Sequence, residues 1–223
     1  MASTAGTLGA NLTTMATAMK FRTVRFKNLS LCLKELEPFV RSGTHLRTGR
    51  GFKRFDGLRS RELLGNWLLC VTLNFVTTPH RFIFTSDPSG GDGIIFDTST
   101  ENTWPTEHIF VPPMRADEKA TIEELILKAI DQKRQKGGAA YASGKTLVVF
   151  LDSGGGVWFP NKVARSLPKP LLFDAAWVVG LHAVDAGEYS YDATCLDLSG
   201  GAAPAYRIQI SKDFDDWTVQ QVQ

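Results

Sequence analysis

The chain has few cysteines, and their spacing excludes two common uses of that residue. Its 223 residues include three cysteines, Cys32, Cys70 and Cys195. The number is odd, the spacing is wide and no Cys-x-x-Cys pair occurs, so we expect neither a disulfide framework nor a cysteine-based zinc site. We therefore expect a cytoplasmic protein.

The chain also lacks a hydrophobic run long enough to cross a membrane. The longest run, residues 63–76, is interrupted by small and polar residues, whereas a membrane-spanning helix needs about 20 consecutive apolar residues. We therefore expect no membrane partner. Residues 1–19 carry no charged side chain and lack the basic start and leucine-rich middle of a secretory signal. We expect them to form a flexible tail.

Positive charge is concentrated in one part of the sequence. The net charge is only +2, but residues 20–61 contain twelve Lys or Arg against three acidic residues. Phenylalanines interleave with this basic block, and such a block attracts polyanions such as nucleic acid. We assign nucleic-acid contacts to Arg47, Arg50, Lys53, Arg54 and Arg59. The alternative interpretation is a solvated surface that balances an acidic remainder.

The pattern of apolar residues predicts an α/β protein with a central mixed sheet flanked by helices. We expect a basic helix-and-loop arm over residues 20–57, followed by a single α/β domain over residues 58–223. Alternation of strands and helices after Asp117 favours some parallel pairing. The expected helices are 29–40 (stopped near Pro38), 58–74 (capped by Ser60), 117–136 and 160–167. The expected strands are 81–85, 93–96, 108–111, 145–151 and 175–181, with further strand and a polar tail after them.

Two carboxylates are placed where neighbouring strands would bring them to one end of the sheet. Asp92 stands between glycines before the apolar run of residues 94–96, and Glu107 opens the next apolar run. Carboxylates held close together repel each other unless a cation lies between them, and Mg²⁺ prefers oxygen ligands. The segment is therefore a candidate metal site. The alternative is that Asp92 is a turn residue and Glu107 merely begins a strand.

The order of elements over residues 58–152 and the acids placed on them resemble the PD-(D/E)XK nuclease superfamily. The resemblance implies a restriction-endonuclease-like core and Mg²⁺, or Mn²⁺, as cofactor. It implies that Asp92, Glu107 and Glu62, the last on the preceding helix, bind the metal. It also implies a lysine two positions after the glutamate, where this chain has Ile109.

In that superfamily the lysine can lie on the following helix, where this chain offers Lys128 and Lys133. We assign Lys133 a catalytic role together with Asp92 and Glu107. The resemblance thus predicts a metal-dependent nuclease acting on DNA or RNA, or a degenerate relative, and leaves open whether the chain forms a homodimer. The alternative is a non-enzymatic module that binds nucleic acid or a protein through its basic arm.

Two other patterns are weaker. Gly144-Lys145-Thr146 follows a predicted helix and precedes a predicted strand, the reverse of a phosphate-binding loop, and Ala139 stands in place of its first glycine. Ser153 has no nucleophile-elbow pattern around it. We assign neither segment a catalytic role.

Overall fold

The computed structural model describes residues 25–43, 50–114, 117, 119–153, 156–197 and 200–223. Its centre is one mixed sheet of eight strands in the order β1-β2-β3-β4-β5-β6-β7-β8. The strands are β1 (Phe82–Thr85), β2 (Ile94–Asp97), β3 (Thr103–Val111), β4 (Thr146–Leu151), β5 (Ala175–Asp185), β6 (Glu188–Leu196), β7 (Ala205–Ile210) and β8 (Trp217–Gln221). Strands β3, β4 and β5 are parallel and all other pairs are antiparallel. The α/β prediction is confirmed.

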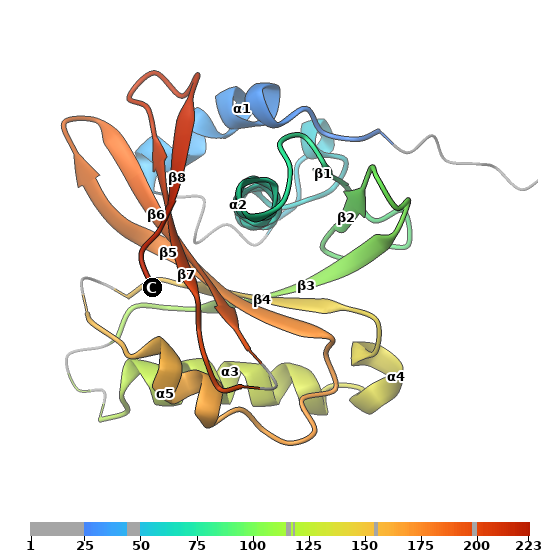
Figure 1. Cartoon of the computed structure of the whole chain (residues 1–223), viewed down its shortest axis with the longest axis vertical. Helices are drawn as coiled ribbons and strands as arrows, with labels where there is room; N and C mark the ends of the chain where they lie inside the picture. Colours follow the sequence, from blue (N-terminus) through green and yellow to red (C-terminus); the bar gives the residue numbers. More distant parts are fainter. Residues whose placement is uncertain (1–24, 44–49, 115–116, 118, 154–155, 198–199) are drawn as a thin grey trace, which may run out of the picture.

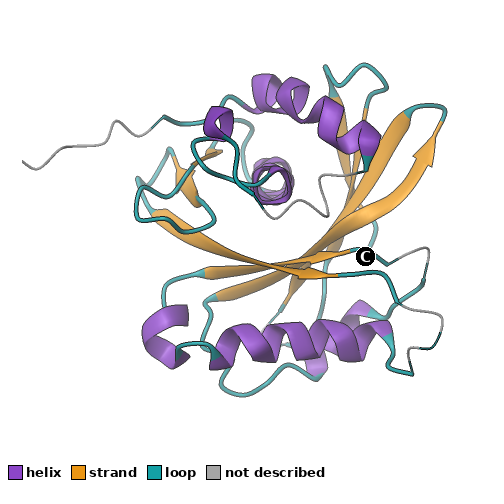
Figure 2. Cartoon of the chain, turned by 180° about the vertical axis from the view of Figure 1, so that it is seen from behind, coloured by secondary structure: helices purple, strands orange, loops and turns teal. Residues whose placement is uncertain are grey.

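Helices cover both faces of the sheet (Figures 1 and 2). The sheet curls around α2 (Ser60–Val76), and α1 (Leu29–Ser42) lies beside that helix. The opposite face carries α3 (Ile122–Gln135), α4 (Gly138–Ala142) and α5 (Pro160–Arg165), while the short 3₁₀ helix η2 spans Lys53–Phe55. No helix in the described part of the chain is long and apolar enough to span a membrane.

The central strand β4 separates two hydrophobic cores. Val148 and Phe150 belong to the core on the α2 face, and Leu147 and Val149 belong to the core on the α3 face. All six residues of the strand are buried, which is why this segment reads as a continuous apolar run rather than an alternating one. The expected strand at 145–151 is confirmed.

Helix α2 is buried around most of its circumference because the sheet wraps it. Trp67 and Leu68 are fully buried, and the helix contains only a few charged residues, all near its start. A helix that is apolar on every side is stable only inside a core. The expected helix at 58–74 is confirmed, but Ser60 is its first residue rather than its cap, which is Arg59.

The segment expected to form a separate basic arm contributes to this core from residue 25 onward. Leu33, Leu36 and Phe55 are fully buried, and the Trp67 indole of α2 donates a hydrogen bond to the Leu29 carbonyl of α1 at 2.9 Å. The part of residues 20–57 that the structure describes is therefore built into the domain. Residues 1–19, expected to form a tail, lie outside the described residues.

Three expectations about element ends are wrong. Helix α1 continues through Pro38 to Ser42 and ends at Gly43, which adopts the left-handed conformation common after helix ends. The helix expected over residues 117–136 is shorter, because α3 begins at Ile122, directly after its cap Thr121. The segment expected to be a polar tail forms β8, which pairs with β7 along the edge of the sheet.

Candidate functional site

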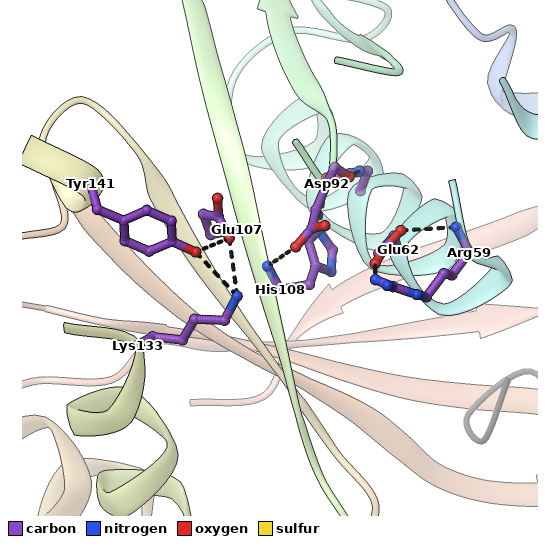
Figure 3. A network of polar contacts seen from close by, with 8 residues as sticks. Arg59, Glu62, Asp92, Glu107, His108, Lys133 and Tyr141 are labelled. Carbon is purple, nitrogen blue, oxygen red and sulfur yellow. Dashed lines mark hydrogen bonds and ion pairs between the residues drawn. The ribbon is translucent and has the colours of Figure 1, made fainter. Parts of the chain in front are cut away.

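The candidate site lies where β2 and β3 separate. The two strands pair only between residues 94–96 and 103–105. A last backbone hydrogen bond joins the Thr106 amide to the Gly93 carbonyl at 2.8 Å. Asp92 precedes this point, and its Oδ2 atom accepts a hydrogen bond from the His108 amide at 2.7 Å (Figure 3). The Asp92 carboxylate therefore caps the edge of β3 at the position where β2 would have continued.

A buried polar network holds Asp92 in this place. Asn66, on α2, is fully buried, and its Nδ2 donates to the Asp92 carbonyl at 2.9 Å. The Asn66 Oδ1 atom accepts from the Thr106 hydroxyl at 2.9 Å and lies 3.2 Å from His108 Nε2. Because these side chains are buried and bonded to other elements, the network ties α2 to the point where the strands separate.

Gly93 is required at this junction for two reasons. Its φ angle is +140°, and a Cβ atom there would lie 2.2 Å from Asn66 Nδ2. A side chain would therefore both strain the backbone and displace the amide that supports Asp92.

Glu107 lies on the α3 face of β3 and is surrounded by hydrogen-bond donors. Lys133 Nζ, from α3, lies 3.0 Å from Glu107 Oε2, and Lys145 Nζ, at the start of β4, lies 3.1 Å from Oε1. The Tyr141 hydroxyl, from α4, also donates to Oε2. Figure 3 shows Lys133 and Tyr141 converging on Glu107 from the side of β3 opposite to Glu62.

Burial and hydrogen bonding shift the pKa of Glu107 in opposite directions. Burial raises the pKa of this carboxyl group, but hydrogen bonds from Tyr141 and Lys133, and then from Lys145, outweigh it and hold the pKa below its ordinary value. The same contact, together with burial as the larger cause, raises the pKa of Tyr141. Glu107 is therefore a carboxylate and Tyr141 a neutral phenol near neutral pH.

The charges of Asp92 and Glu107 both affect the pKa values of Tyr141 and His108. Both charges raise the pKa of Tyr141, although burial is the largest cause of its shift. Both also oppose the burial that lowers the pKa of His108 to about 4. His108 is therefore a neutral, buried side chain packed against Gly65 of α2.

Glu62, the third predicted metal ligand, caps its own helix instead. Its Oε2 atom accepts from the Arg59 amide at 2.8 Å, and its Oε1 atom pairs with the Arg59 guanidinium. Burial, and then the charge of Asp92, raise the pKa of Glu62. A residue in the first turn of a helix faces the free amides of that turn, which explains this capping role. Among the described residues, no three or more His, Cys, Asp or Glu side chains form a group that could hold a metal ion.

The residues assigned to nucleic-acid contacts are divided among several roles. Arg50 and Lys53 are exposed. Arg54 stacks over the rings of Phe39 and Phe55 at 4.8 Å and 4.7 Å, and Arg59 pairs with Glu62. Arg47 lies outside the described residues.

Sequence reasoning missed Lys145, Tyr141 and Asn66 as members of the site. Lys145 immediately precedes the buried strand, and Glu107 aligns with Leu147 in the parallel register of β3 and β4. Since side chains two residues apart share a face of a strand, Lys145 projects on the same side as Glu107. A lysine at the start of a buried strand can be recognised in the sequence. Neither segment alone shows the strand register that places this lysine beside Glu107.

Comparisons of the chain with models of known protein families, with curated proteins and with solved structures find no match.

Proposed function

We propose that this chain is a nuclease-like protein of the PD-(D/E)XK type that acts on phosphodiesters of DNA or RNA. The observation that carries the proposal is the surroundings of the Glu107 carboxylate. Lys133 and Lys145 flank it, and the backbone amide of the next residue in β3 donates to Asp92. The order α2-β1-β2-β3-α3-α4-β4, with β3 and β4 parallel, supports a restriction-endonuclease-like core. The lysine missing at position 109 has two candidate substitutes from other elements.

The donor chemistry of the site fits Mg²⁺. Proteins commonly hold this ion with one or two carboxylates together with substrate phosphates. Asp92 and Glu107 are the two candidates, and Glu107 would have to exchange a lysine or tyrosine contact for the ion. When bound, the ion would lower the pKa of a coordinated water and stabilise charge on the phosphate. Glu62 is engaged by Arg59, so we assign it to positioning α2 rather than to binding the metal.

The chain's own groups supply fixed positive charge and orientation. Lys133 and Lys145 hold two ammonium groups beside Glu107, where they would stabilise negative charge that develops on a phosphate. Tyr141 fixes Lys133 through a contact of 3.3 Å. Its ring also lies 4.3 Å from the Lys145 ammonium, so both lysines are restrained before a substrate arrives.

Cleavage of labelled DNA and RNA with and without Mg²⁺ tests the proposal. We expect Asp92→Asn, Glu107→Gln and Lys133→Met each to reduce cleavage at least about a hundredfold, the order of magnitude found when one transition-state contact is removed. Lys128→Met is the matched control because Lys128 lies on the same helix and is exposed. Cleavage that persists in Asp92→Asn would refute the assigned site.

The non-enzymatic alternative is favoured by one observation. Both oxygens of Glu107 are occupied by lysines and a tyrosine, so the carboxylate has partners without a metal. Nucleic-acid binding that is independent of divalent ions and unchanged in Asp92→Asn, without cleavage, would identify a binding module.

A further inference from the structure

A pocket of about 520 Å³ lies beyond the end of β4, and its apolar lining includes Leu151, Trp158 and Val178. All three belong to or pack against the core on the α3 face. Strand β5 continues past the end of β4, because Leu151, the last residue of β4, pairs with Gly180. The pocket therefore lies at the carboxyl ends of parallel strands, where α/β sheets commonly bind ligands.

Three polar side chains that line this pocket, Asp192, Arg207 and His182, form one bonded group. Arg207 binds both oxygens of Asp192, with Nε 2.9 Å from Oδ1 and Nη2 3.2 Å from Oδ2. Asp192 pairs with Gly180 on one side and with Arg207 on the other, so this row shares one face of the sheet. Gly180 follows Val178 by two positions, which places the row on the α3 face with the pocket.

His182 joins this group because β5 bulges at that residue. The pairing of β5 with β6 shifts between Leu181 and Ala183, so His182 is an extra residue on β5. Its Nδ1 atom lies 3.2 Å from Arg207 Nη2 and 3.2 Å from Asp192 Oδ2. Bulges are frequent beside functional sites, where they redirect a side chain.

The contacts within this group occupy its acceptors and leave donors available. Both oxygens of Asp192 accept from Arg207. When the neutral His182 ring accepts from Arg207 at Nδ1, its own hydrogen lies on Nε2. In the part of the chain that the structure describes, the Nη1 group of Arg207 makes no hydrogen bond, and the side chain is partly exposed. The group can therefore donate to a ligand that brings acceptors.

A buried hydroxyl in the pocket lining also lacks a partner. Thr194 is 2% exposed, lines the pocket and makes no side-chain hydrogen bond to any described residue. It pairs with Val178 on one side and Ala205 on the other, so its side chain lies on the pocket face. Arg207 is its diagonal neighbour, at a separation of roughly 7–8 Å that long side chains can bridge. A buried hydroxyl without a partner costs free energy, which a ligand acceptor would recover.

We propose that this pocket binds a small carboxylic acid, whose carboxylate accepts hydrogen bonds from Arg207 and Thr194. The apolar body of the ligand lies against Leu151, Trp158 and Val178. A guanidinium matches the planar geometry of a carboxylate, and the volume is within the roughly 300–1,000 Å³ of small-molecule pockets. Asp192 offsets the charge of Arg207, so a carboxylate with one negative charge meets less repulsion than a phosphate with two.

The pocket is separate from the candidate site and independent of the function proposed for it. Glu107 aligns with Leu147, near the start of β4, whereas the pocket begins at Leu151, the end of that strand. Four residues of a strand span roughly 13 Å. Binding of a carboxylic acid can therefore be tested without measuring cleavage.

Calorimetric titration of the full chain with benzoate tests the ligand class. We expect saturable binding that is at least about tenfold tighter than that of acetate or benzamide. Acetate lacks the apolar body and benzamide lacks the negative charge. Phenyl phosphate, which carries two charges near neutral pH, should also bind more weakly than benzoate.

Substitutions test the residues. Arg207→Gln should weaken benzoate binding at least about tenfold, because it removes a hydrogen bond between two charged groups, and Thr194→Val should weaken it roughly two- to tenfold. The control is Arg165→Gln, since Arg165 lies exposed on α5 outside the pocket lining, and it should leave the affinity unchanged. Equal affinities of Arg207→Gln and Arg165→Gln would overturn the proposal.

A measurement on the unmodified chain covers the case in which a variant does not fold. Benzoate should shift the backbone amide NMR signals of Gly180, Thr194 and Arg207, which lie on three neighbouring strands, and should leave those of Asp92 and His108 unchanged. Shifts centred elsewhere, equal binding of benzamide, or no saturable binding up to about 10 mM benzoate would contradict a carboxylate pocket at this position.

Discussion

At Glu107, two lysines from other elements supply the positive charge that the family resemblance led us to seek at position 109. Ile109 is partly buried and packs against the core on the α3 face, so this position contributes an apolar side chain to that core. Lys133 and Lys145 reach Glu107 while keeping side-chain exposures of 15% and 28%. The charge is thus supplied from positions where hydration is partly retained.

The close packing around Gly93 predicts the effect of adding a single methyl group there. Gly93→Ala should destabilise the fold by about 1–3 kcal/mol more than Gly90→Ala, the usual cost of overpacking a filled site. Both glycines have positive φ angles, but a Cβ at Gly90 has nothing within 4 Å, whereas one at Gly93 meets Asn66 and Thr106. Urea unfolding of the two variants measures the difference. Equal stabilities would show that Asn66 moves aside without cost.

Asp97 makes a prediction about acid stability. Hydrogen bonds from the Arg81 guanidinium hold the pKa of Asp97 far below its ordinary value of 3.8. A carboxyl group whose pKa is lower in the folded state stabilises the fold above its unfolded pKa, and this contribution disappears as the pH falls through the folded pKa.

The melting temperature of the chain should therefore fall as the pH is lowered below about 4, and Asp97→Asn should reduce this dependence. Asp131→Asn is the control, because Asp131 is more exposed and pairs with Arg134 one turn away. An unchanged acid profile in Asp97→Asn would contradict the assignment.

At the scale of elements, the sequence predicted the features that depend mainly on neighbouring residues. Thr121 followed by Glu124 has the sequence pattern of a capping box, and both of its hydrogen bonds are present at the start of α3. The apolar run of β4 is buried on both faces. The path of α1 through Pro38 was missed because it depends on tertiary packing, since Leu36 and Val40 are buried on either side of the proline. Element identity was thus accessible from sequence, whereas ends set by packing were not.

Helix α1 should stabilise the domain as a core element. Leu36→Ala should cost about 2–5 kcal/mol, the usual range for truncating a fully buried leucine, because Leu36 is 0% exposed. Leu31→Ala on the same helix should cost little, since Leu31 is 68% exposed. Chemical denaturation of both variants checks the contrast. A small effect of Leu36→Ala would restore the interpretation of this segment as a separate arm.

At the scale of the whole molecule, the candidate site depends on how the strands and helices are assembled. Asp92 and Glu107 are candidates from sequence because each opens or precedes an apolar run. The sequence does not show that Glu62 caps its own helix, because that contact depends on the geometry of the first turn of α2. Lys145 reaches Glu107 through the register of two parallel strands, which pairs segments separated by a helix and follows from the assembled core rather than from either segment.

The basic surface around α1 and η2 makes the last prediction. Truncating residues 1–54 would remove part of the core, so the charge must be tested by substitution. Neutralising exposed Arg50 and Lys53 together, as Arg50→Gln and Lys53→Gln, should weaken nucleic-acid binding. It should also flatten the dependence of log K on log salt by up to about 0.9 for each phosphate that the chain no longer neutralises. The control replaces Lys162 and Arg165 by Gln on α5, which covers the other face of the sheet, and should leave the slope unchanged. Equal slopes in all three proteins would show that the basic block is a solvated surface.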